Sequence, residues 1–419
     1  MTKRERVIKA INHETPDRTP LDLGATGQTG ISASALYKLR KALGLKEKPI
    51  KISEMFQMLG RVDEDVLERL GVDVIGLNSP YNMFGVKHTG YKPFTMSDGT
   101  PVLISEGNAL EAMSDGSVLV YPQGDRSAAP SAIMPAGGYF FDNIDRVPGF
   151  DEGNLTPVED FAHSFSVMDN ETALYFEKEA ARLCDETDYA VIGNFGGASL
   201  GDSAILPGPA EKSPAGIRRF DDWLMAHILF PDYIRAVLEL QTDIALQNLK
   251  IFRQAVQDKI QIVWLSGTDF GTQNAEMISP GAFKNLYKPY YKKINDWVHN
   301  NTVWKTFFHC CGSIVNLLDD FVEMGVDILN PVQVSAKGMD ATMLKDKYGA
   351  SFTFWGGGVD TQNTLPFGTP GQVREEVLQR IKTFGRGGGY VFNTVHNILA
   401  GTPVENIMAM YEALTDSNI

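Results

Sequence analysis

His309 and Cys311 carry the residue types of a metal site, and they stand two residues apart in the segment FFHCCGSI. They directly follow an apolar run at residues 304–308, which is typical of a buried strand. Imidazole nitrogen and thiolate sulfur together suit zinc. A helix that begins next to the thiolate favours its charged form. The spacing therefore predicts a zinc site, which for catalysis needs a third protein ligand and an open position.

We expect His396 to be the third ligand, because it follows the last apolar run and reaches the other two if the strands close into a barrel. The alternative is that His309 is a hydrogen-bonded core histidine and that both neighbouring cysteines pack. In strand geometry Cys310 points away from its neighbours, so we expect it to pack. Cys184 lies in a predicted helix and is expected in the core. Three cysteines, two of them adjacent, make a poor disulfide framework and fit a reducing compartment.

Other polar side chains fall at the ends of predicted strands, where parallel sheets keep their chemistry. We assign Asp269 to catalysis beside His309 and Cys311, with a loop cap as the alternative. Glutamines are not acid–base catalysts, so they bind an oxygen-rich substrate or tie loops together; Gln362 is one of them. The residues predicted to bind substrate are Asn194, Gln273, Asn330, Gln333 and Asp360.

Eight apolar runs predict the strands that position these residues: RTPLDL, VDVIGL, YAVIGNF, IQIVWL, WKTFFHC, VDILNP, SFTFWG and YVFNT. Most precede a helical pattern, which indicates an α/β fold with a parallel sheet. Eight units favour a closed (β/α)₈ TIM barrel over an open doubly wound sheet. An N-terminal helix on Val7, Ile8 and Ile11 extends the barrel. A further helix is expected after an N-cap at Ser313, on Ile314, Leu317, Leu318, Phe321 and Val322.

Two stretches differ from the repeated strand–helix pattern. Residues 49–60 are interpreted as a loop with a short helix. Residues 81–145, rich in Gly, Pro, Ser and Asp, predict a small antiparallel β insertion, and residues 1–419 are predicted to form a single domain around it. The Gly-rich loop at residues 196–209 is a weak candidate phosphate cradle, since it has no lysine and no nucleotide fingerprint.

The net charge of −14 argues against nucleic acid and anionic membranes as partners. No apolar stretch approaches the length of a membrane span, and residues 1–18 lack the apolar core of a signal peptide. We therefore expect a cytoplasmic protein. The chain also lacks a GxGxxG fingerprint after a strand, a P-loop and a GxSxG elbow.

The chain resembles the uroporphyrinogen decarboxylase superfamily, and within it the cobalamin-dependent methyltransferases. The resemblance is carried by KRERVIKAINHETPDRTPLD, GTDFGTQ, FFHCCGSI, GVDILNPVQVSAKGMD, FWGGGVDTQNTLPFGTP and GGGYVFNTVHNILAGTPVENIMAMYEAL. It implies a (β/α)₈ barrel. In the methyltransferases an H-x-C-G pattern supplies zinc ligands, here His309 and Cys311, and another cysteine commonly follows the last strand. This chain has His396 there instead.

The resemblance implies a zinc-dependent methyltransferase that moves a methyl group between a small O-, S- or N-methylated substrate, or a thiol acceptor, and cobalamin on a separate corrinoid protein. It also implies a possible homodimer. The decarboxylases hold substrate carboxylates with an arginine-rich loop after the first strand. The corresponding segment DLGATGQTGIS has no arginine, which argues against a porphyrinogen substrate. The alternatives are a metal-free decarboxylase-like lyase for a smaller acid, and a scaffold without chemistry.

Overall fold

Seven parallel strands form the central sheet, in the order β15-β14-β13-β12-β11-β10-β3. The computed structural model describes residues 1–147 and 149–416. Most strand residues are buried and apolar, as in a parallel sheet covered by helices. The strands are Val74–Leu77 (β3), Ala190–Gly193 (β10), Ile262–Ser266 (β11), Lys305–His309 (β12), Ile328–Asn330 (β13), Thr353–Trp355 (β14) and Tyr390–Val391 (β15).

A short segment around Leu21 joins the two edges of this sheet. Next to β15, the Phe392 N–H donates to Pro20 O at 2.8 Å, and the Asp22 N–H donates to Phe392 O at 2.9 Å. Next to β3, the Asp73 N–H donates to Leu21 O at 2.8 Å. The α/β TIM-barrel prediction is confirmed. The predicted first strand is too long, because only Leu21 forms a β bridge and Pro20 has no N–H to give.

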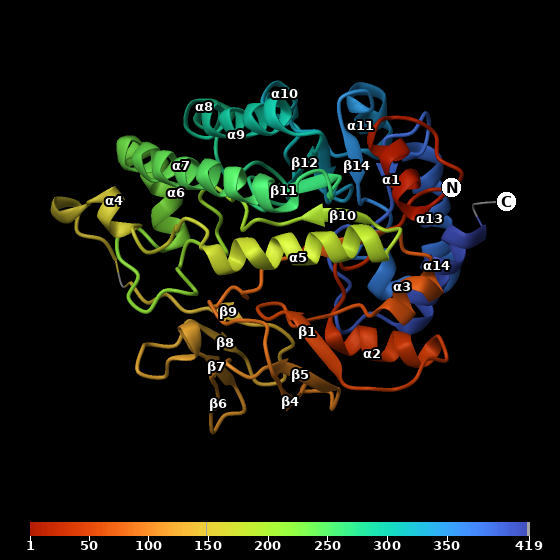
Figure 1. Cartoon of the computed structure of the whole chain (residues 1–419), viewed down its shortest axis with the longest axis horizontal. Helices are drawn as coiled ribbons and strands as arrows, with labels where there is room; N and C mark the ends of the chain where they lie inside the picture. The colour runs from red at the N-terminus through yellow and green to blue at the C-terminus, as the bar shows by residue number, and fades with distance from the viewer. Residues whose placement is uncertain (148, 417–419) are drawn as a thin grey trace.

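Helices surround the sheet, and Figure 1 shows α5 and α7 running along it. α1 packs Val7 and Ala10 against residues of the barrel interior and so covers the amino-terminal end of the strands. Ile8, predicted on its apolar face, is exposed. The helices are Lys3–Ile11 (α1), Ala33–Ala42 (α2), Glu64–Leu70 (α3), Pro157–Asp160 (α4), Asn170–Glu186 (α5), Phe220–Leu229 (α6), Pro231–Val256 (α7), Pro280–Leu286 (α8), Lys288–Asn301 (α9), Leu318–Glu323 (α10), Ala341–Tyr348 (α11), Thr364–Phe367 (α12), Pro370–Phe384 (α13) and Val404–Asp416 (α14).

The β insertion forms two further sheets, in the orders β2-β1-β5-β4 and β6-β7-β8-β9, grouped below the barrel in Figure 1. Residues 49–60 contribute the first two of these strands, so the loop and short helix predicted there are wrong. We propose that insertion and barrel share one domain, because one core cluster holds residues of both. The strands are Ile50–Glu54 (β1), Leu59–Gly60 (β2), Tyr91–Thr95 (β4), Pro101–Ser105 (β5), Leu110–Ala112 (β6), Val118–Val120 (β7), Ala132–Met134 (β8) and Asp142–Asn143 (β9).

Two local predictions need correction. The helix after the His309 segment begins at Leu318 and not at Ser313, whose hydroxyl instead donates to Lys337 O at 2.7 Å. Val322 on this helix is exposed. Cys184 is partly exposed rather than a core residue.

In the described residues, no helix combines the length and apolar character that crossing a membrane requires.

Candidate metal centre

His309, Cys311 and His396 converge at the carboxyl ends of the barrel strands. One possible ligand atom from each lies within 4.8 Å of the other two. The His309 Nε2 atom is 3.2 Å from Cys311 Sγ, and the two imidazole rings are 5.2 Å apart between centroids. His309 ends β12 and His396 follows β15, which is not a neighbouring strand. The curl of the sheet therefore brings them together. Residues 1–147 and 149–416 contain no second group of this kind.

Asn330 fixes the orientation of His309. The register pairs these residues across β12 and β13. His309 Nδ1–H donates to Asn330 Oδ1 at 2.5 Å, and Asn330 Nδ2 donates to Trp355 O at 2.8 Å. The hydrogen thus sits on Nδ1, and the electron pair of Nε2 faces Cys311. Asn330, predicted to bind substrate, is fully buried and positions the histidine.

The loop that carries Cys311 is held from two sides. The Cys311 N–H donates to Asp269 Oδ1 at 2.6 Å, and this oxygen is 3.8 Å from His309 Nε2. The Gly312 N–H donates to Gln333 Oε1 at 2.8 Å. Gly312 has φ +87°, and a Cβ there would lie 2.4 Å from backbone atoms of Gly271, so only glycine fits. Cys310 is buried, as predicted, and its sulfur accepts the Phe270 N–H.

His396 has a strained backbone with φ 112°, a conformation that non-glycine residues rarely adopt. The Thr394 hydroxyl donates to His396 O and holds this turn. Such strain concentrates at functional sites, where the surrounding structure maintains it. The strained backbone of His396 therefore supports a functional role for this histidine at the carboxyl ends of the strands.

Burial dominates the electrostatics of this group. It lowers the pKa of His309 to about 4 and, with the charge of His309, the pKa of His396 to about 4. Both imidazoles are therefore neutral at pH 7, the state that binds a metal. Burial and then the charge of Asp269 raise the pKa of the Cys311 thiol, and burial raises the pKa of Asp269. Two neutral imidazoles and a cysteine fit the three-ligand set of a catalytic zinc.

Gln273 and Gln333 tie loops together at the edge of this site. Gln333 Nε2 donates to Gln273 Oε1 at 2.9 Å, and Gln273 Nε2 donates to Ser335 O at 2.6 Å. Ser335 also bonds Gln362, at 3.2 Å. These amides thus use their hydrogen bonds within the chain, which favours the loop-tying alternative.

Asn194 and Asp360 make their side-chain hydrogen bonds within their own loops. Asn194 Oδ1 accepts the Gly196 N–H at 3.0 Å. Asp360 accepts the Gln362 N–H at 2.8 Å and the Asn363 side chain at 2.9 Å. Both side chains cap their own strand-end loops, and binding of substrate by either stays a prediction.

Sequence reasoning missed Asp202, a buried carboxyl in the Gly-rich loop after β10. Burial, and then the charge of Asp269, raise the pKa of Asp202 to about 7. Its charge in turn acts on the Cys311 thiol, so it lies near the candidate metal centre. No motif marks Asp202; its position after a strand was the available signal.

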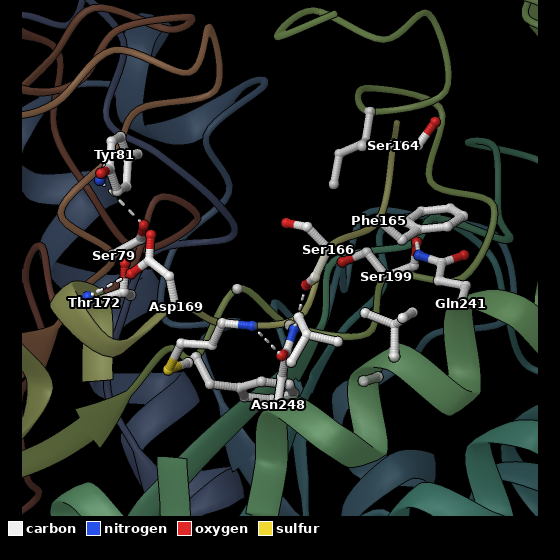
Figure 2. Close-up of a pocket in the computed structure, with 18 of the residues that line it drawn as sticks. Ser79, Tyr81, Ser164, Phe165, Ser166, Asp169, Thr172, Ser199, Gln241 and Asn248 are labelled. Atoms are coloured by element: carbon white, nitrogen blue, oxygen red, sulfur yellow. Dashed lines mark hydrogen bonds between the residues drawn. The ribbon is translucent and has the colours of Figure 1, made fainter. Parts of the chain in front are cut away.

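A cavity of about 450 Å³ lies against the same Gly-rich loop (Figure 2). Ser199 and Gln241 line one end of it, and Ser79 and Asp169 line the other. The Asn248 side chain stabilises the irregular segment that forms part of the cavity wall. It accepts the Met168 N–H at 2.6 Å and donates to Ser166 O at 2.9 Å. The lining contains neither the two histidines nor the cysteine of the candidate metal centre, and no lysine or arginine. The lining thus gives no support to a phosphate cradle.

Comparison with known proteins identifies the family. A sequence model of the family described as uroporphyrinogen decarboxylase (URO-D) matches residues 148–417, well over half of the chain. The chain therefore belongs to the URO-D family. It is 25% identical over 189 residues to a uroporphyrinogen decarboxylase of Prochlorococcus marinus, covering 44% of this chain and 51% of that protein.

Two further relatives extend the comparison. Uroporphyrinogen decarboxylase of Parasynechococcus marenigrum is 27% identical over 139 residues, covering 33% of this chain and 37% of that protein. The chain thus spans about half the length, or less, of these curated relatives. A solved structure of a methyltransferase from Methanosarcina mazei aligns over 99% of both chains with a TM-score of 0.53 and 16% identity. At that identity the likeness establishes a shared fold.

Proposed function

We propose that this chain is a zinc-dependent methyltransferase of the URO-D family that works with a separate corrinoid protein. The observation that carries the proposal is the convergence of His309, Cys311 and His396 within 4.8 Å. The fold shared over 99% of its length with a methyltransferase supports it. The arginine-free segment at residues 22–32 also favours a substrate other than a many-carboxylate porphyrinogen.

Each residue of the site has a distinct task in this proposal. His309 Nε2, Cys311 Sγ and a His396 nitrogen would hold the zinc, and Asn330 and Asp269 would keep the first two in position. Bound there, zinc would act as a Lewis acid towards the oxygen, sulfur or nitrogen of the methyl donor or acceptor. Burial of both histidines keeps their electron pairs free of protons at pH 7. A homodimer and a cytoplasmic location stay predictions.

The direct test is methyl transfer to free cob(I)alamin, followed by its absorbance change, with a panel of methyl ethers, thioethers and amines. We expect turnover in the zinc-loaded wild type and a loss of at least about a thousandfold in Cys311→Ala, because a bound metal contributes several kcal/mol to a polar transition state. Cys310→Ala is the matched control and should stay active. Equal rates in wild type and Cys311→Ala would contradict the proposal.

A metal-free decarboxylase acting on a small carboxylic acid is the second candidate. The curated relatives favour it, since they are uroporphyrinogen decarboxylases. This candidate predicts release of CO₂ from a zinc-free preparation and no need for corrinoid. Asp202 and Asp269 would supply its acid–base groups. Decarboxylation that persists after a chelator would establish it over the methyltransferase.

A further inference from the structure

Three polar side chains from different elements face one small space beside Gly267, in the loop after β11. A Cβ built on Gly267 would lie 3.0 Å from Cζ2 of Trp264, 3.4 Å from Oδ2 of Asp202 and 3.5 Å from Nε2 of Gln28. Gln28 comes from the loop after the Leu21 segment, and Asp202 from the loop after β10. Because glycine has no side chain, the indole edge, the carboxyl and the amide approach its backbone closely.

One of these three groups lacks the partner that a buried polar group normally has. Trp264 is 6% exposed, and its Nε1–H is buried without a hydrogen-bond partner. This nitrogen belongs to the same edge of the indole as Cζ2, the atom nearest Gly267. The Gln28 side-chain amide is partly exposed and makes no hydrogen bond to the described residues. Asp202, 9% exposed, accepts the Ala204 N–H at 2.8 Å and has no cationic partner among them. A buried N–H without a partner indicates a missing ligand or water.

We propose that Trp264, Asp202 and Gln28 form a recognition site for a hydroxyl group of the substrate, a proposal that rests on the methyltransferase function. A hydroxyl both accepts and donates hydrogen bonds. It can accept the N–H of Trp264 or Gln28 and donate to the carboxyl of Asp202. A carboxylate ligand would be repelled by the Asp202 and Asp269 charges. A cation would leave the indole N–H unpaired.

The position of this hydroxyl site links it to the candidate metal centre. Gly267 stands two residues before Asp269, whose carboxylate accepts the Cys311 N–H. The charge of Asp202 acts on the Cys311 thiol. The Gly267 N–H donates at 2.9 Å to Ser199 Oγ, which also lines the cavity of Figure 2. The predicted substrate class is therefore a small methyl compound, or methyl acceptor, with a free alcohol or phenol.

The test compares the binding of ligand pairs that differ by one hydroxyl. Calorimetry on the zinc-loaded full chain would use guaiacol against anisole, methylthioethanol against ethyl methyl sulfide, and dimethylaminoethanol against dimethylethylamine. We expect the hydroxyl member to bind at least about tenfold more tightly in one or more pairs, because its absence leaves the buried Trp264 N–H unpaired. Equal binding in every pair, or no binding in any, would overturn the proposal.

Two variants locate the preference. Trp264→Phe keeps the ring and removes an N–H that makes no bond, so the melting temperature should hardly change while the preference falls several-fold. Asp202→Ala should also reduce it. Trp304→Phe is the matched control: its Nε1–H donates to Gln257 O at 3.2 Å, so stability should fall and the preference should stay. An unchanged preference in Trp264→Phe would contradict the site.

Zinc content of the same preparations separates the two proposals. A chain that holds zinc, transfers methyl groups and shows no hydroxyl preference contradicts the hydroxyl site alone. A chain that prefers hydroxyl ligands through Trp264, yet neither holds zinc nor transfers methyl groups, contradicts the methyltransferase alone.

Discussion

The carboxylates at the two ends of the barrel differ in whether they have a cationic partner. At the amino-terminal end, the fully buried Asp73 accepts hydrogen bonds from Arg6 and Arg18 at 2.7 Å and from the Leu21 N–H at 2.9 Å. At the carboxyl-terminal end, the buried Asp202 and the partly exposed Asp269 have no lysine or arginine partner among the described residues.

We interpret this difference as a division of roles, with the amino-terminal end serving stability and the carboxyl-terminal end serving function. A buried charge without a partner destabilises the fold, so its presence calls for a reason outside the folded chain. Asp73 has all its partners within the protein and serves the closure of the barrel. Asp202 and Asp269 have backbone N–H partners but no cationic partner among the described residues, and the Trp264 N–H has no partner at all. The carboxyl-terminal end is therefore where ligands are expected to bind.

Removal of Asp73 should produce the largest loss of stability. Asp73→Ala removes the carboxylate that Arg6 and Arg18 share, and leaves Arg6 with Asp17 alone. We expect the free energy of unfolding to fall by about 3–5 kcal/mol. Denaturant unfolding measures the change, with zinc affinity of the folded protein as the second readout. Little loss of stability would break the comparison, because the amino-terminal end would then not depend on its ion pairs.

Asp22 is a buried carboxyl that also lacks a cationic partner among the described residues, and its contribution to stability should depend on pH. Burial raises its pKa to about 6, against an ordinary value of 3.8, although Trp355 Nε1 donates to it at 2.9 Å. Between those two values the folded chain binds the extra proton, so stability should rise as the pH falls from about 6 to about 4. The contribution is about 3 kcal/mol. Denaturant unfolding of wild type and Asp22→Asn from pH 4 to pH 8 measures it, and a difference that does not vary with pH contradicts it.

Asn330 tests whether the carboxyl-terminal end is organised around a metal. Asn330→Ala removes the acceptor of His309 Nδ1–H, and loss of such a partner commonly weakens metal binding about 10- to 100-fold. Asn295→Ala is the control: this equally buried asparagine donates to Met324 O at 2.8 Å, away from the site. It should lose stability and keep its zinc affinity. Equal zinc affinities in the two variants would show that Asn330 is only structural.

The sequence predicted much of the fold because apolar runs directly record burial. Seven of the eight predicted runs contain regular strands. The eighth run failed because it forms its hydrogen bonds only around Leu21. The helix after Cys311 starts late because Gly312 is in a left-handed turn and Ser313 bonds another loop. Side-chain partners of this kind are set by tertiary structure.

The candidate site divides in the same way. His309, Cys311 and His396 were predicted from residue type and position at strand ends, and they lie together. The task of Asn330 depends on the register of β12 and β13, which one sequence does not reveal. Asp202 and Trp264 were missed because a loop carboxylate and a strand tryptophan look ordinary until the loops meet around Gly267.

The most direct test of the central proposal is the metal content of purified wild type, Cys311→Ala, His396→Ala and the control Cys310→Ala. We expect about one zinc per chain in wild type and in the control, and its loss in the other two variants, since three protein ligands hold a catalytic zinc. Wild type that takes up no zinc when zinc is added would contradict the proposed metal centre. So would zinc that remains in both Cys311→Ala and His396→Ala.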